Sequence, residues 1–252
     1  MSKFKIPNFP SQNFDERRLV DGLRSIRHIV IHYTGMDTAE SAIERLCDPK
    51  SGVSCHYMID EMGAIYVLVD ENHRAWHAGI AYWGGIRDIN STSIGIELAN
   101  PGHGNGYCAF TEAQMLSLET LLDEILSRHT ISPGNVLGHS DIAPGRKADP
   151  GELFDWERLG AAGLVLWPDS ISQSAGLPEP NSGDSLRNLS SIGYAMPGKI
   201  AFGGDILHSS SGVTDVVCAF QRRFRPSLCD GNWDAETHAL TTIVAHLYNS
   251  HS

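Results

Sequence analysis

Two histidines and one aspartate stand out for the chemistry that they could perform together. His32 directly follows the β-branched run 29–31, and His139 and Asp149 flank a loop rich in proline and glycine. Two neutral imidazoles and a carboxylate suit a zinc ion, and three protein ligands leave a fourth position open for water, as in catalytic zinc sites. The spacing of the last two ligands does not match one turn of a helix, so we expect the three side chains to converge from separate elements.

Glu97 is a carboxylate in an otherwise apolar segment, 92–98. Ile94, Ile96 and Leu98 would share one face of a strand, which places Glu97 on the opposite face. A carboxylate that faces a metal-bound substrate could act as general acid and base. The same pattern also fits an outward-facing glutamate on a half-exposed strand.

Lys147 lies two residues before Asp149, and an extended backbone there would direct both side chains the same way. A cation in that position could stabilise the oxyanion that forms when an amide is attacked. Arg146, its neighbour, is ambiguous and could simply be solvated.

Five segments resemble, in their order along the chain, those of a known enzyme family. They are 29–34, 54–60, 75–79, 92–98 and 138–150. The resemblance is to the zinc-dependent N-acetylmuramoyl-L-alanine amidases of the AmpD and AmiD type, which are related to amidase-type phage lysozymes and animal peptidoglycan recognition proteins. The similarity covers most of residues 25–170.

The resemblance implies a role for each residue named above. His32, His139 and Asp149 would bind zinc. Glu97 would be the general base and acid, and Lys147 would polarise the reacting carbonyl. In zinc enzymes the metal lowers the pKa of its bound water to about 7, which makes a nucleophile available near neutral pH.

Further positions follow from the same resemblance. His77, Trp76 and Tyr33 would contact the substrate, although a packed tryptophan beside a loop histidine is the plainer interpretation of the first two. Cys55 stands where the phage-lysozyme branch has a catalytic tyrosine, and that branch lacks a glutamate matching Glu97. The chain is therefore similar to the AmpD/AmiD branch, and we expect Cys55 to be buried.

The coarse pattern predicts an α+β fold, with a mixed central sheet flanked by helices. Runs of β-branched and apolar residues predict strands at 27–33, 55–60, 64–69, 92–98 and 135–139. A helix is expected at 39–47, and a longer one opens at Thr111, where Gln114 completes a capping-box pattern. Its apolar stripe should be core.

Composition divides the chain into a catalytic domain at 1–172, a Ser/Pro/Gly-rich linker at 173–185 and a small helical domain at 186–252. Helices are expected in the last part at 184–193, 213–224 and 234–249. The run 219–226 resembles the helical peptidoglycan-binding-like domain that follows the catalytic domain in AmiD-type enzymes. Phe220 and Phe224 within it fit a core role equally well.

Charge and cysteine content limit the partners and the compartment. The net charge of −11 disfavours nucleic acid and anionic membranes. Residues 1–26 contain no apolar run of signal or membrane-span length, which favours a cytoplasmic protein, or a periplasmic one if a signal was removed. Five cysteines without regular spacing argue against a disulfide framework. We expect a monomer.

The sequence thus predicts an amidase that cleaves the amide between the lactyl group of (anhydro-)N-acetylmuramic acid and L-alanine of the stem peptide. Soluble anhydromuropeptides and intact peptidoglycan present the same bond, and the sequence does not distinguish them. One alternative is a non-catalytic peptidoglycan-recognition protein, and another is a zinc amidohydrolase that acts on an unrelated amide.

Overall fold

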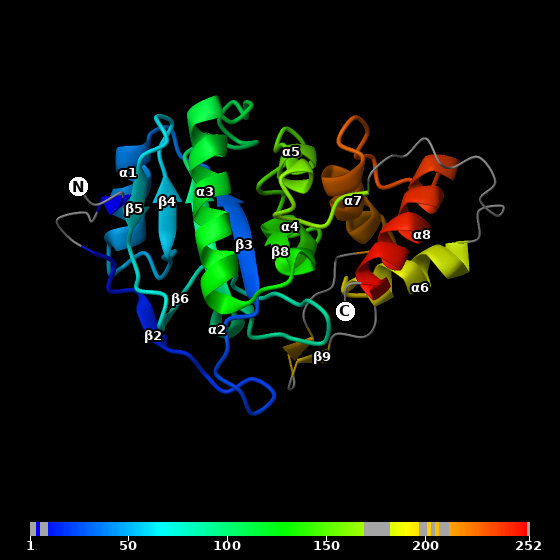
Figure 1. Ribbon diagram of the computed structural model, residues 1–252, viewed down its shortest axis with the longest axis horizontal. Helices are drawn as coiled ribbons and strands as arrows, with labels where there is room; N and C mark the ends of the chain where they lie inside the picture. Colours follow the sequence, from blue (N-terminus) through cyan, green and yellow to red (C-terminus); the bar gives the residue numbers. More distant parts are fainter. Residues whose placement is uncertain are drawn as a thin grey trace.

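A six-stranded mixed sheet forms the centre of the computed structural model (Figure 1). The structure describes residues 4–5, 10–168, 182–196, 201–202, 205–206 and 212–250. The strand order is β1-β5-β4-β7-β3-β8. The strands are β1 (Phe4–Lys5), β3 (His28–Tyr33), β4 (Tyr57–Ile59), β5 (Ile65–Val67), β7 (Ser93–Leu98) and β8 (Val136–Gly138). Strands β4, β7, β3 and β8 are parallel neighbours, and β5 runs antiparallel to β4.

Two short antiparallel pairs lie outside this sheet. They are β2 (Phe14–Glu16) with β6 (His73–Ala75), and β9 (Ala201–Phe202) with β10 (Asp205–Ile206). All five predicted strands are present, each shorter by one to three residues. The strands that were not predicted are two or three residues long, too short for a periodic pattern to be recognised.

The described helices are five that were predicted, which lie close to their expected positions, and three short ones that were not. They are α1 (Ala39–Cys47), α2 (Ile89–Thr92), α3 (Glu112–His129), α4 (His139–Ile142), α5 (Trp156–Ala161), α6 (Ser182–Ile192), α7 (Val213–Phe224) and α8 (Ala235–Ser250), with a 3-10 turn, η1, at Pro133–Asn135. The predicted capping box of Thr111 and Gln114 is formed at the start of α3. No described helix is long and apolar enough to cross a membrane.

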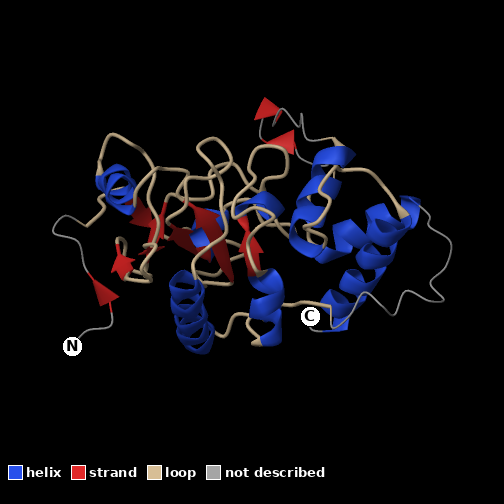
Figure 2. Ribbon diagram, turned by 90° about the horizontal axis from the view of Figure 1, so that it is seen from above, coloured by secondary structure: helices blue, strands red, loops and turns tan. Residues whose placement is uncertain are grey.

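One face of the sheet is covered by α3 and α5 (Figure 2). The alternate side chains of β3 and β7 that point to this face pack against the apolar stripe of α3; they are Ile29, Ile31, Ile94, Ile96 and Leu98. Each such buried side chain contributes about 1.5–3 kcal/mol. Because strand side chains alternate, His32 and Glu97 must point to the opposite face, as predicted.

The C-terminal helices lie at the β8 end of the sheet, and α1 lies at the other end (Figures 1 and 2). Val30 and Leu137 of the sheet share one hydrophobic cluster with Val217 and Phe220 of α7 and Leu240 of α8. Of the expected linker, residues 173–181 lie outside the described residues, and α6 has already begun at Ser182. The predicted domain boundaries therefore stay a prediction, but the described helices and the sheet share a core.

Candidate active site

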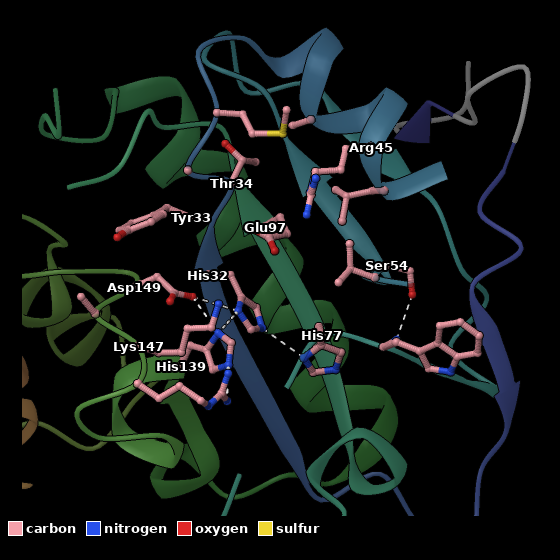
Figure 3. Close-up of a pocket in the computed structure, with 18 residues that line it drawn as sticks. His32, Tyr33, Thr34, Arg45, Ser54, His77, Glu97, His139, Lys147 and Asp149 are labelled. Atoms are coloured by element: carbon pink, nitrogen blue, oxygen red, sulfur yellow. Dashed lines mark hydrogen bonds and ion pairs between the residues drawn. The ribbon is translucent and has the colours of Figure 1, made fainter. Parts of the chain in front are cut away.

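The three predicted ligands converge at the carboxyl ends of β3 and β8 (Figure 3). His32 lies near the end of β3, His139 directly follows β8 as the first residue of α4, and Asp149 lies in the loop beyond. Nδ1 of His32 is 2.9 Å from Nδ1 of His139, and each of these atoms is 3.0 Å from Oδ2 of Asp149. All three side chains are buried.

This arrangement fits a zinc ion. Around a tetrahedral zinc with bonds of about 2.0–2.1 Å, ligand atoms lie about 3.3 Å apart, close to the separations found here. Burial lowers the pKa of His32 to about 4, which keeps its imidazole neutral at pH 7. Burial acts to raise the pKa of Asp149, but the two imidazoles beside it lower that pKa below its usual value, so the carboxylate is ionised.

The tautomer of His139 is fixed by a backbone carbonyl. Nε2 of His139 lies 3.0 Å from the carbonyl oxygen of Ala78, and a carbonyl oxygen can only accept a hydrogen bond. Nη2 of Arg146 also lies 3.3 Å from Nε2 of His139, but both of its hydrogens are donated to carbonyl oxygens at 2.7 Å. The proton of His139 is therefore on Nε2. The lone pair of Nδ1 is left to point at His32 and Asp149, as a metal ligand requires.

The tautomer of His32 follows from a longer chain that ends at another carbonyl. The hydroxyl of Ser93 donates to the carbonyl oxygen of Ile89 at 2.6 Å, so its oxygen accepts from Nε2 of His77 at 3.2 Å. Nδ1 of His77 is then unprotonated and accepts from Nε2 of His32 at 3.1 Å. This places the lone pair of His32 on Nδ1, the atom that faces the other two ligands.

His77 lines the pocket, where sequence reasoning expected it, but both of its ring nitrogens have protein partners. Burial lowers its pKa well below the usual value, consistent with the neutral ring that the hydrogen-bond chain requires. Gly95 of β7 makes room for the ring: a Cβ atom on Gly95 would lie 2.5 Å from Cγ of His77. The contacts of His77 therefore favour orientation of His32 over direct contact with a ligand.

Glu97 lies beside His32, because β3 and β7 are parallel and these two residues are register partners. Its side chain lines the pocket, and its Oε2 has no hydrogen-bond partner among the described residues. Burial and the charge of Asp149 raise the pKa of Glu97 well above its usual value, whereas Lys147 acts to lower it. A carboxyl group with a raised pKa suits a general acid and base.

Two basic residues of the loop 143–149, here called the ligand loop, reach the pocket. Lys147 is exposed and lines it, on the same side as Asp149. Arg146, which the sequence left ambiguous, donates hydrogen bonds of 2.7 Å to the carbonyl oxygens of Ala78 and Ile80. Arg146 therefore connects the ligand loop to the segment that follows His77.

Sequence reasoning missed Arg45. This exposed residue of α1 points into the pocket towards Glu97 (Figure 3). No periodic signal could have found it, because an arginine on the polar side of an amphipathic helix is ordinarily solvated. Arg45 and Lys147 are thus cations on opposite walls of the pocket.

The pocket has a volume of about 690 Å³, within the range of small-ligand sites. Tyr33 and Trp76, the other two predicted substrate contacts, both line it. Cys55 does not line the pocket and is buried, as expected. Burial raises the pKa of its thiol well above the usual value, which argues against a nucleophilic role.

Comparison with known proteins gives a consistent result. A family profile described as N-acetylmuramoyl-L-alanine amidase matches residues 22–152. The N-acetylmuramoyl-L-alanine amidase AmiD of Escherichia coli is 35% identical over 241 residues, which span 88% of this chain and 83% of AmiD. The 1,6-anhydro-N-acetylmuramyl-L-alanine amidase AmpD of Haemophilus influenzae is 35% identical over 166 residues, 59% of this chain and 86% of AmpD.

Two solved structures are similar over almost the whole chain. AmiD from E. coli, in complex with the substrate anhydro-N-acetylmuramic acid-L-Ala-D-γ-Glu-L-Lys, matches with a TM-score of 0.77 and 34% identity and covers 94% of this chain and 98% of its own. AmpDh3 from Pseudomonas aeruginosa, in complex with anhydromuramic pentapeptide, matches with a TM-score of 0.76 and 32% identity. The match covers 90% of this chain and 94% of the AmpDh3 chain.

Proposed function

The chain belongs to the N-acetylmuramoyl-L-alanine amidase family, and we propose that it hydrolyses the amide between the lactyl group of anhydro-N-acetylmuramic acid and L-alanine of the stem peptide. The observation that carries this proposal is the convergence of three ligand atoms within 3.0 Å beside the half-buried Glu97. The muropeptide ligands of the two similar structures support the choice of substrate.

Zinc is the proposed cofactor, held by His32, His139 and Asp149. When bound, it would supply Lewis acidity, lowering the pKa of a coordinated water to about 7 and polarising a carbonyl oxygen. Glu97 would accept a proton from the attacking water and return it to the amine of L-alanine as that group leaves. Such a positioned acid and base contributes about 10²–10⁴-fold. Lys147 would stabilise the negative charge that develops on the former carbonyl oxygen.

The cations on opposite walls suggest how the substrate lies in the pocket. A γ-linked D-glutamate, as in the AmiD ligand, leaves its α-carboxylate free two residues beyond the lactyl group. We propose that Arg45 binds this carboxylate, because an exposed guanidinium can pair with a carboxylate through two hydrogen bonds. The peptide would then run towards α1, while Tyr33 and Trp76 contact the ligand from the pocket walls.

The main alternative is a recognition protein that binds muropeptides without cleaving them. All three ligands and Glu97 are present and close together, which favours an enzyme. A zinc amidohydrolase for an unrelated amide is disfavoured by similarity to muropeptide-bound structures over 90% or more of the chain.

Mass spectrometry of the products tests the proposal. Zinc-loaded protein would be incubated with anhydro-N-acetylmuramyl tripeptide and, in parallel, with intact peptidoglycan. Free peptide together with an uncut sugar is the expected result, and the faster reaction would identify the natural substrate. Binding of either compound without cleavage would contradict the proposal in favour of a recognition protein. The cytoplasmic location and the monomeric state stay predictions, to be checked by cell fractionation and light scattering.

A further inference from the structure

Asp141 is a buried carboxylate two residues after the proposed ligand His139, in the same short helix, α4. It is 1% exposed and lies outside the pocket, facing the C-terminal helices. Its Oδ2 accepts hydrogen bonds from the backbone N–H of Gly138 at 2.8 Å and from Nη1 of Arg223 at 2.9 Å. Its Oδ1 accepts from the hydroxyl of Tyr194 at 2.6 Å.

Arg223 comes from α7, 82 residues further along the chain, and is 2% exposed. The same Nη1 also donates to the carbonyl oxygen of Val136 at 3.0 Å, and the guanidinium lies 4.2 Å from the centre of the Trp156 ring. Arg223 thus contacts the first residue of β8 and, through Asp141, the helix that begins with His139. A single side chain holds the strand and the ligand helix together.

Two more residues of α7 contact the same part of the amidase fold. Nε of Arg222 lies 3.6 Å from a carboxylate oxygen of Glu152, just beyond the ligand Asp149. Asp215 lies so close to Gly145 that a Cβ atom on that glycine would be 2.8 Å from its carboxyl carbon. We call residues 136–152 the ligand segment; α7 contacts it near its start, in its middle and at its end.

A buried ion pair is weak evidence for stability, because desolvation offsets much of the attraction between the charges. Its geometric effect is stronger, since buried charges tolerate few alternative arrangements. Around metal sites, groups that hold the ligands at the correct orientation are important for affinity. Arg223 and Asp141 hold the helix that begins with His139, although neither residue contacts the imidazole of His139.

We propose that α7 positions the ligand segment for metal binding, with Arg223 as a positioning residue that acts on His139 through Asp141. The proposal rests on the metal site of the proposed function and goes beyond it, because it makes the C-terminal helices a part of the catalytic unit. Tyr194, which precedes α7 in the chain, supports the same carboxylate from a second side.

Zinc affinity of the full-length protein tests this role, and α7 offers a matched control. Arg225, 4% exposed at the end of the same helix, pairs with Asp234 and Glu236, which both belong to the C-terminal part. Arg223→Lys and Arg225→Lys would be compared by competition for zinc with a chromogenic chelator, and by the visible spectrum of the cobalt-substituted protein. Lysine keeps the charge but lacks the planar guanidinium that contacts two acceptors and an aromatic ring.

Arg223→Lys should bind zinc up to about 10-fold more weakly, which is less than the loss of a direct hydrogen-bond partner of a ligand would cause, and should alter the cobalt spectrum. Arg225→Lys should leave both unchanged, even where its melting temperature falls. A folded Arg223→Lys protein with wild-type affinity and spectrum would overturn the proposal.

If Arg223→Lys does not fold, zinc affinity would be measured for Tyr194→Phe, which removes only the hydroxyl that donates to Asp141. A several-fold weaker zinc affinity is expected for it, and an unchanged affinity would again overturn the proposal. Wild-type protein that binds no zinc would instead contradict the metal site of the proposed function, and this inference with it.

Discussion

At the scale of single residues, metal binding depends on which ring nitrogen of His32 and His139 carries the proton, as well as on where these side chains lie. Two hydrogen-bond chains that end at the carbonyls of Ala78 and Ile89 leave Nδ1 of both proposed histidine ligands unprotonated. The sequence predicted the ligands from their chemical types and from the family resemblance. It could not predict these chains, because the partners of His32 come from a loop, a short helix and a strand that meet only in the folded protein.

Replacing Gly95 should weaken metal binding without touching a ligand. In Gly95→Ala the new methyl group would displace the ring of His77, which then no longer orients His32. We expect about 10–100-fold weaker zinc affinity, measured by competition titration. Gly104→Ala is the control, since a Cβ atom on Gly104 would meet nothing within 4 Å beyond its chain neighbours. Equal zinc affinity in the two variants would refute the role given to His77.

Replacing Arg45 should affect the binding of an acidic peptide selectively. Arg45→Ala should lower kcat/KM about 5–10-fold for a muropeptide with a free α-carboxylate on D-glutamate, the effect of one exposed charge-assisted contact. The corresponding carboxamide substrate should be hardly affected. Steady-state kinetics on both substrates provide the test, and Lys50→Ala, a nearby cation that does not line the pocket, is the control. The same loss on both substrates would show that Arg45 does not bind this carboxylate.

At the scale of helices and strands, the elements with strong periodic patterns were predicted well. Strands β3 and β7 and helices α1 and α7 lie within one residue of their expected ends, and α3 begins directly after its predicted cap, Thr111. The predictable part is therefore the frame of the site. The short helix α4 was not predicted, because four residues show no period, and its position depends on β8, Asp141 and the C-terminal helices.

Glu71 links β4 to α3, and this link should make the stability of the fold depend on pH. Its carboxylate accepts hydrogen bonds from Tyr57 of β4 and from Arg128 and His129 at the end of α3. Burial acts to raise the pKa of Glu71, but these partners lower it from 4.5 to about 2. A lowered pKa in the folded state means that the stabilisation is complete above pH 4.5 and is lost as the pH falls towards 2.

Glu71→Gln should therefore lose about 1–2 kcal/mol of unfolding free energy at pH 7, after allowance for the partial exposure of Arg128. The difference from wild type should shrink between pH 4.5 and pH 2.5, as measured by urea denaturation. Glu157→Gln, at an exposed position of α5, should show no such change. A difference for Glu71→Gln that stays constant over this range would contradict the assignment.

At the scale of the whole molecule, overall charge and local charge differ. The chain carries a net charge of −11, yet Arg45, Arg146 and Lys147 line the pocket. An anionic peptide would be attracted to the pocket and repelled elsewhere, because fields are concentrated in clefts. The sequence predicted Lys147 in the site but could not predict that Arg45 joins it, since this depends on how α1 and the loop 143–149 face each other.

The shared core predicts that the catalytic part does not fold well alone. A chain that ends at residue 168 would expose Val30, Leu137 and Ile142, which pack against the C-terminal helices. We expect this truncated chain to lose the cooperative thermal transition, as measured by circular dichroism. When the full-length chain is cut at a protease site inserted between residues 169 and 181, the two fragments should elute together in size-exclusion chromatography. A truncated chain that melts cooperatively and hydrolyses muropeptide would show that the two parts are independent.

The central claim is that three side chains hold a catalytic zinc and that Glu97 moves the proton. The most direct measurement is bound zinc and muropeptide turnover, determined side by side for wild type, Glu97→Ala and His139→Ala. We predict one zinc per wild-type chain, zinc but at least about 100-fold lower turnover in Glu97→Ala, and neither zinc nor turnover in His139→Ala. Turnover near the wild-type rate in Glu97→Ala, or full zinc content in His139→Ala, would contradict the account.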